Sequence, residues 1–132
     1  MAGERDLRKL LAGMDPVLNP GRYVYCTFPG RVPTGLRPVV TVAEAEGVTA
    51  VVEQAEAEAL GLTYTYPAAW ITLRVTSALD AVGLTAAVAG RLTEHGISCN
   101  VVAGFHHDHL FVDAEHAERA VRALAELAAE SA

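Results

Sequence analysis

The chain has 132 residues, of which 52% are hydrophobic and 20% are charged, a composition typical of a packed globular protein. This length suits one ordinary domain or two small fused ones. The net charge of −6, with a single lysine beside nine arginines, argues against sequence-independent nucleic-acid binding, which requires a basic surface. Neither a signal-peptide pattern nor an apolar run of roughly eighteen residues occurs. We therefore expect a soluble, cytoplasmic protein that does not associate with membranes.

Signatures of catalysis are missing from the sequence. It contains neither the Gly-x-Ser-x-Gly nucleophile pattern nor a phosphate-binding loop that ends in Gly-Lys-Ser/Thr. The two cysteines, Cys26 and Cys99, lie in separate apolar segments and lack the spacing of a redox pair or a disulfide framework. We expect two buried free thiols in a protein that is not an enzyme and carries no cofactor.

The first half of the chain predicts helices and strands in a mixed order. Its expected elements are a helix over 4–14, a strand over 23–28, strands over 39–43 and 48–52, and a helix over 54–60. Residues 63–69 do not continue the preceding helical pattern, and we expect them to form an extended, linker-like segment. We place a boundary there, so that residues 1–62 form an N-terminal half and residues 63–132 a C-terminal half.

The second half shows clearer periodicity. Its expected elements are a strand over 70–76, a helix over 81–95, strands over 97–103 and 107–112, and a last helix capped by Asp113. Leu84, Ala87, Val88 and Leu92 give the first of these helices one apolar face. Both halves fit the α+β class, in which a mostly antiparallel sheet has helices packed on one face.

Two motifs in the second half resemble the ACT domain. The run D-x-x-G-L-T-A-A-V-A-x-x-L-x-x-x-G-I-S over 80–98 is similar to its first helix, and V-V-A-G-F-H-H-D-H-L-F-V over 101–112 to its following hairpin. The opening of the chain resembles small bacterial proteins of unknown function that are built from two ACT-like halves. The F-x-x-D-H-x-x-V run is also similar to the arginine-sensing domains of a eukaryotic cytosolic arginine sensor.

The resemblance implies a ferredoxin-like βαββαβ fold and a regulatory module that binds an amino acid. ACT domains usually regulate an attached catalytic domain, which these 132 residues do not contain. The ligand and the regulated partner therefore do not carry over from the family. The family's ligand positions map onto the loop before the first helix and the facing hairpin, that is, onto Asp80, Ala81, Val82, Gly83, Leu84, Gly104, Phe105, His106 and Asp108.

Elementary chemistry supports a ligand site at these positions. A helix N-terminus offers unpaired N–H groups and a partial positive charge to a carboxylate, and Asp108 suits an ammonium or another cation. Gly83 lets a ligand approach the backbone, or it serves helix–strand packing instead. Asp108 is equally suited to closing its own turn, and Asp80 is most simply the N-cap of the helix.

Three histidines surround Asp108 and suggest a second kind of site. On a strand, His107 and His109 project to one face, and His106 and Asp108 project to the other. Such histidines can bind zinc, but the sequence does not identify a third ligand, so metal binding is the weaker alternative.

A protein-interaction module without a ligand, which regulates a partner through a sheet edge, is the other alternative. We expect a homodimer.

Overall fold

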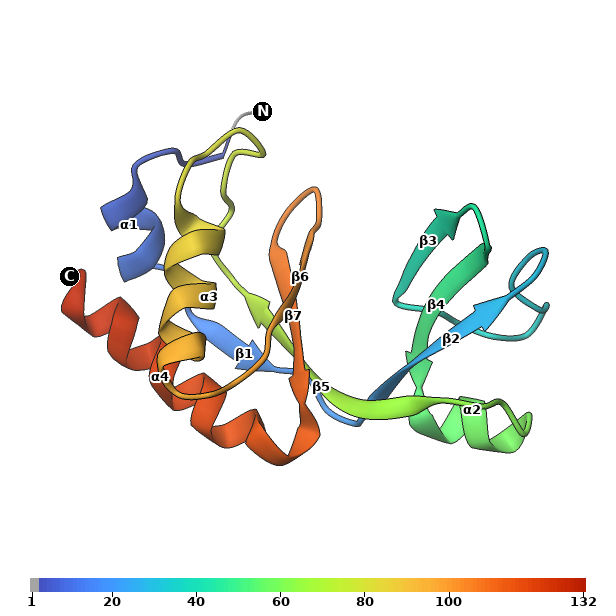
Figure 1. Ribbon diagram of the computed structural model, residues 1–132. Helices are drawn as coiled ribbons and strands as arrows, with labels where there is room; N and C mark the ends of the chain where they lie inside the picture. The colour runs from blue at the N-terminus through green and yellow to red at the C-terminus, as the bar shows by residue number, and fades with distance from the viewer. Residues whose placement is uncertain (1–2) are drawn as a thin grey trace. The chain divides into compact units, whose positions relative to one another are not determined.

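The computed structural model describes residues 3–132, which form two compact units (Figure 1). Unit 1 combines the residues up to Pro20 with Ala69–Ala132, and unit 2 consists of Gly21–Ala68. The chain therefore begins in unit 1, forms unit 2 and then returns to complete unit 1. No helix among the described residues has the length and apolarity that crossing a bilayer requires.

Unit 1 is a four-stranded sheet with helices on one face. Its elements are α1 (Leu7–Ala12), β1 (Pro16–Leu18), the end of β5 (Thr65–Leu73), α3 (Leu84–Glu94), β6 (Asn100–Ala103), β7 (Asp108–Asp113), the 3-10 turn η1 (Ala114–His116) and α4 (Ala117–Glu130). The strand order is β1-β5-β7-β6, with β1 antiparallel to β5 and β6 antiparallel to β7. This is a ferredoxin-like sheet whose last strand, β1, comes from the start of the chain.

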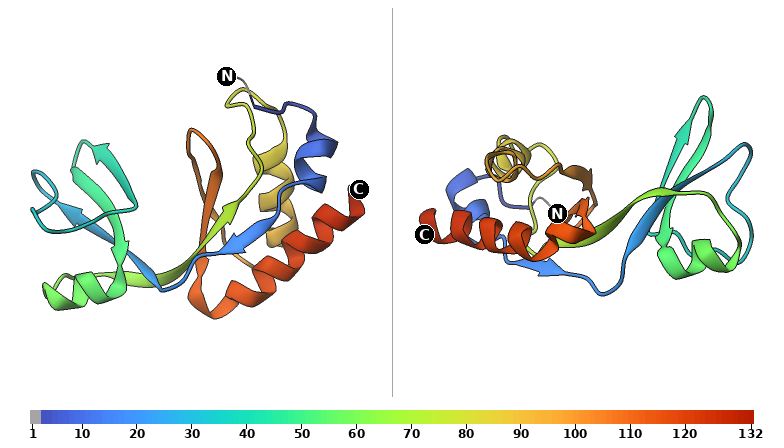
Figure 2. Two further views of the ribbon diagram at one scale, coloured as in Figure 1. Left: turned by 180° about the vertical axis from the view of Figure 1, so that it is seen from behind. Right: turned by 60° about the horizontal axis from the view of Figure 1, so that its bottom comes forward.

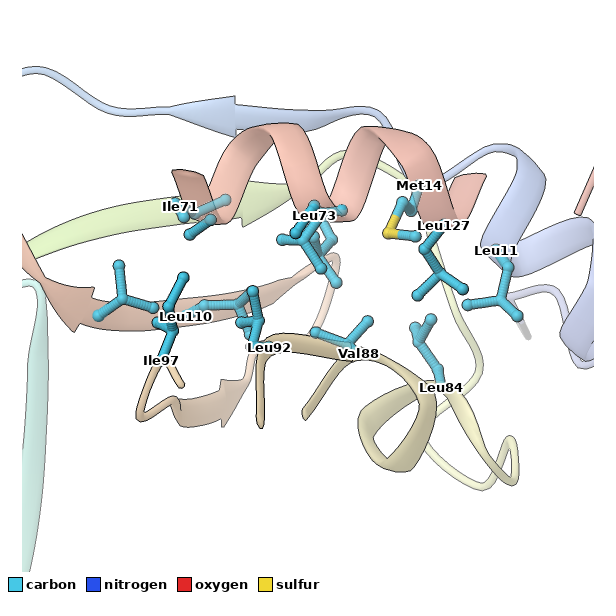
Figure 3. Close-up of a cluster of buried hydrophobic side chains, with 14 of the residues drawn as sticks. Leu11, Met14, Ile71, Leu73, Leu84, Val88, Leu92, Ile97, Leu110 and Leu127 are labelled. Atoms are coloured by element: carbon cyan, nitrogen blue, oxygen red, sulfur yellow. The ribbon is translucent and has the colours of Figure 1, made fainter. Parts of the chain in front are cut away.

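One hydrophobic core holds unit 1 together. Side chains from the three helices and from the inner faces of β5 and β7 point toward one another (Figure 3). Leu92, Leu110 and Leu124 are fully buried at its centre. Helix α1 packs beside the C-terminal end of α4, as all views show (Figures 1 and 2), and contributes Leu10 and Leu11. The apolar face predicted for the first helix of the second half is thus the face of α3 that packs.

Among the described residues, unit 2 also has four paired strands, but it has one α-helix where unit 1 has three. Its elements are β2 (Tyr23–Phe28), β3 (Val40–Glu44), β4 (Gly47–Glu53), α2 (Gln54–Ala59) and the start of β5, in the order β3-β4-β2-β5. A loop over residues 29–39 follows β2, where a ferredoxin-like fold has its first helix. Val32 and Leu36 of this loop pack on the small core formed by β2, β4 and α2.

The segment expected to be a linker, residues 63–69, is instead largely part of strand β5. Thr65 and Ala68 pair with β2, and the register shifts by one residue between them. Tyr66 in this bulge has a φ of 64°, and the extra residue interrupts the strict alternation that identifies a strand. The interpretation as a linker was wrong because the bulge hides the strand periodicity.

The start of the chain also differs from expectation. The helix is restricted to Leu7–Ala12, because Glu4 instead pairs with Ser77 in a parallel bridge. Residues 16–18 form β1, a strand that the sequence did not indicate, and β6 begins only at Asn100. The division into halves at residues 62 and 63 stays a prediction, whereas by contacts the first twenty residues group with the second half.

Candidate functional site

Two segments face each other at one end of unit 1. One is the loop of residues 76–83 with the first turn of α3, and the other is the tip of the β6–β7 hairpin, residues 103–108. The tip and the loop lie at the same end of the unit as the N-terminal segment (Figures 1 and 2). Two neighbouring pockets lie between these segments and share Ser77, Ala78 and Leu79 as a common wall.

The smaller pocket, which we call the inner pocket, has a volume of about 130 Å³. The residues that line it besides the common wall are Ala81, Gly83, Leu84, Thr85, Ala103 and Asp108. Asp108 is the first residue of β7 and lies on the same side of the strand as Leu110, which faces the helices. Its half-buried carboxylate accepts no hydrogen bond from residues 3–132.

Burial dominates the electrostatics of Asp108 in the inner pocket. It raises the pKa of this carboxyl group, and the nearby His109 and His107 lower the pKa only in part. A positive group beside the carboxylate would offset this penalty.

Helix α3 supplies the opposite charge at the same pocket. Its N-cap is Gly83, with φ of 104°, and no side chain caps the helix. The N–H groups of the first turn are thus left for another acceptor, and the helix dipole adds positive potential. A Cβ at Gly83 would also lie 3.1 Å from Leu7 Cδ2, so this glycine serves packing as well as pocket shape. The packing contact of Gly83 is with helix α1 and not with a strand, and its ligand role stays a prediction.

The expectation that Asp80 is the N-cap of α3 was wrong. The helix begins four residues later, and Asp80 instead binds the guanidinium of Arg5 through two hydrogen bonds of 3.0 and 3.1 Å. Both side chains are exposed, and this contact lowers the pKa of Asp80. No local sequence pattern indicates this pair, because 75 positions separate its members.

The larger pocket, which we call the outer pocket, has a volume of about 320 Å³. Besides the common wall, it is lined by Gly3, Arg5, Thr76, Asp80, Phe105 and His106. Phe105 is 74% exposed and lies edge-on to the ring of His106, with 5.1 Å between the ring centroids. Leu79 on the opposite side is 70% exposed. The outer pocket thus carries apolar surface that folding has left open to solvent.

The N-terminal segment forms one wall of the outer pocket. Glu4 N–H donates to Thr76 O at 3.0 Å, and Ala78 N–H donates to Glu4 O at 3.0 Å. A Cβ at Gly3 would lie only 2.6 Å from the carbonyl carbon of Ser77, so the two backbones are in close contact. These contacts fix the position of the loop that both pockets share.

The structure divides the predicted site residues between the two pockets. Ala81, Gly83, Leu84 and Asp108 line the inner one, and Asp80, Phe105 and His106 line the outer one. Val82 is 83% exposed and, like Gly104, is absent from both linings. Gly104 instead permits a tight turn, because a Cβ there would lie 2.8 Å from His107 O.

The histidines do not converge. His109 Nδ1 accepts a hydrogen bond of 3.0 Å from Trp70 Nε1, and His106 lies in the outer pocket. Burial lowers the pKa of His109. Within residues 3–132, no three His, Cys, Asp or Glu side chains are grouped to hold a metal ion. These positions give no support to the metal-binding alternative.

Several solved structures are similar to this chain in sequence and in fold. The chain is similar to a Vibrio cholerae protein described as of unknown function and a possible transport protein. The two share 47% identity and a TM-score of 0.85, and the match covers 94% of this chain and 97% of the Vibrio cholerae chain. An Agrobacterium tumefaciens protein matches at 21% identity and a TM-score of 0.68, covering 86% of this chain and 87% of its own.

A third similar structure is the ligand-free regulatory subunit of aspartate kinase from Thermus thermophilus. It has 12% identity and a TM-score of 0.67, over 88% of this chain and 97% of the other, so the likeness concerns the fold alone. No curated protein sequence matches the chain. Residues 2–69 and residues 65–126 each match a sequence profile of the ACT domain. The chain therefore belongs to the ACT-domain family, and its two halves share the α+β fold of that family.

Proposed function

We propose that this protein is a non-catalytic regulatory module that binds a free amino acid in the inner pocket. The observation that carries the proposal is the placement of Asp108 opposite the start of α3. Among residues 3–132, this half-buried carboxylate has no hydrogen-bond partner and the helix has no side-chain cap. An amino acid presents two charges of opposite sign at a short separation. The inner pocket offers the complementary pair.

In the proposed complex, the ligand carboxylate accepts hydrogen bonds from the first-turn N–H groups of α3, beginning at Leu84 and Thr85. The α-ammonium pairs with Asp108. Each interaction is charge-assisted. The ammonium would also offset the penalty that burial imposes on the charged Asp108.

The regulatory part of the proposal is supported by the fold shared with regulatory subunits of aspartate kinase. We include a homodimer and a regulated protein partner in the proposal. Strand β6 ends the strand order among the described residues, and such an edge can pair with another chain. This edge also favours the alternative function, an interaction module that binds no small molecule.

Calorimetric titration of the protein with each of the twenty amino acids tests the proposal. We expect at least one to bind, and we expect Asp108→Asn to abolish that binding because it removes the partner of the ammonium. Asp113→Asn at the other end of β7 is the matched control, since Asn retains the cap that Asp113 provides to Glu115 N–H. Absence of binding by every amino acid would refute the proposal and favour the interaction module.

A further inference from the structure

We infer that the amino acid recognised by this protein has a large apolar side chain, which lies in the outer pocket. This inference rests on the proposed function, because it takes the backbone of the ligand to be bound in the inner pocket. The shared lining of the two pockets, the exposed apolar residues and the arrangement of charge in the outer pocket support it.

The two pockets lie next to each other along the same pair of segments and share three lining residues. Ala103 and Asp108, at the base of the hairpin tip, line the inner pocket, and Phe105 and His106, at its end, line the outer one. The loop on the other side, through Leu79, borders both. An amino acid whose charged groups lie beside Asp108 can therefore extend its side chain outward along the hairpin.

The outer pocket matches an apolar group in size and in surface. Its volume of about 320 Å³ exceeds that of the inner pocket, at about 130 Å³. Leu79 and Phe105 are 70% and 74% exposed and belong to neither hydrophobic core. Covering exposed apolar surface is favourable in proportion to the area removed from water. A branched aliphatic or aromatic side chain would cover both residues.

The charged groups of the outer pocket do not favour a charged ligand side chain. Arg5 and Asp80 already satisfy each other through two hydrogen bonds. An acidic side chain would compete with Asp80 for Arg5, and a basic one would compete with Arg5 for Asp80. An apolar side chain meets no such competition and leaves the ion pair unchanged.

The test compares affinities within one titration series. Wild-type protein should bind leucine, isoleucine, methionine or phenylalanine at least about tenfold more tightly than alanine, because each additional buried methylene strengthens binding. Phe105→Ala and Leu79→Ala should remove most of this preference and leave the affinity for alanine nearly unchanged. Leu60→Ala, which truncates a leucine of unit 2 that is 55% exposed, is the matched control and should leave the preference intact.

The outcomes separate the inference from the proposed function. If a polar or charged amino acid binds most tightly and Asp108→Asn abolishes its binding, the inference is wrong and the proposed function stands. An undiminished preference for apolar ligands in both alanine variants would also overturn the inference, because it would place the side chain elsewhere. If no amino acid binds, the proposed function itself fails, and the inference fails with it.

Discussion

Trp70 on β5 and His109 on β7 are joined by a hydrogen bond of 3.0 Å from the indole Nε1 to the imidazole Nδ1. Because an indole N–H can only donate, Nδ1 must be unprotonated, and the neutral ring carries its proton on Nε2. Thr72 Oγ1 lies 3.2 Å from the same nitrogen. This bond ties together two neighbouring strands at the residue that follows Asp108, and so it helps to position the proposed ligand group.

The Trp70–His109 bond predicts a pH-dependent stability. The pKa of His109 is lowered in the folded state because burial disfavours the charged ring, so unfolded chains bind more protons as the pH falls. The stabilisation is present above the unfolded pKa, near pH 6.5, and is lost as the pH falls through the lower folded pKa. Urea unfolding over this range should show a decreasing free energy of unfolding.

Two variants isolate the contribution of His109. In His109→Gln, an amide oxygen can accept the Trp70 bond but has no titration near neutral pH, so the pH dependence should become weaker. His95→Gln, at an exposed position, should keep the wild-type profile. An unchanged slope in His109→Gln would contradict this account.

Asp108 is expected to lower the free energy of unfolding while it supports the binding of an amino acid. Its pKa is raised by burial, so the carboxylate destabilises the folded state at neutral pH, above both pKa values. Asp108→Asn should therefore raise the free energy of unfolding at neutral pH while it abolishes amino-acid binding. At a pH below roughly 4 the gain should shrink, because a protonated Asp resembles Asn. A variant that is less stable at neutral pH would show that the carboxylate is held by an interaction outside this description.

Much of unit 1 could be predicted from sequence because its helices have clear apolar faces and its strands alternate. The face of α3 and the strand with Ile71 and Leu73 are local patterns that match the core. The start of β5 could not be recognised as a strand, because a bulge at Tyr66 shifts the register by one residue and interrupts the alternation of apolar and polar residues. Residues 16–18 were missed because three residues are too few to show a period.

The candidate site was predicted in part, since its loop and hairpin lie in recognisable motifs. The wall formed by Gly3 and Arg5 was not predicted, because its contacts cross more than seventy positions and leave no local pattern. Asp80 was misassigned for a related reason. An aspartate just before a helix is a preferred N-cap residue. In the structure, however, the helix begins at Leu84, and Asp80 binds the distant Arg5 instead.

Alanine substitutions at two glycines in or next to α3 should change the free energy of unfolding in opposite directions. Gly83→Ala forces a side chain onto a backbone with φ of 104° and brings Cβ within 3.1 Å of Leu7 Cδ2. We expect a loss of about 1–3 kcal/mol in the free energy of unfolding. Gly90→Ala, inside α3 with nothing within 4 Å of the added Cβ, should gain about 0.5–1 kcal/mol.

Chemical denaturation of both variants measures these effects. In a Leu7→Ala background, the penalty of Gly83→Ala should shrink only in part, because the positive φ remains. Equal effects of the two glycine substitutions would contradict the assignment of Gly83 as a conformationally required residue.

The thiols should be nearly inert in the folded protein. Burial raises the pKa of Cys99 to about 11, and burial also raises the pKa of Cys26. At about pH 8 the thiolate fraction of Cys99 is then about one in a thousand, compared with about one in four for an ordinary thiol. A disulfide reagent should label the native protein slowly and label both cysteines quickly in denaturant. The expectation of two buried thiols holds for Cys26, whereas Cys99 is only half-buried. Rapid labelling under native conditions would contradict the raised pKa values.

The most direct test of the central claim is a titration followed by amide NMR. Spectra of the ¹⁵N-labelled protein, recorded with and without a mixture of the twenty amino acids, locate a binding site whatever the preferred side chain. The account predicts shifts at the start of α3 and at the hairpin, at Gly83, Thr85, Ala103 and Asp108, and predicts that Asp108→Asn removes them. Unchanged spectra at millimolar amino acid, or shifts confined to unit 2, would contradict it.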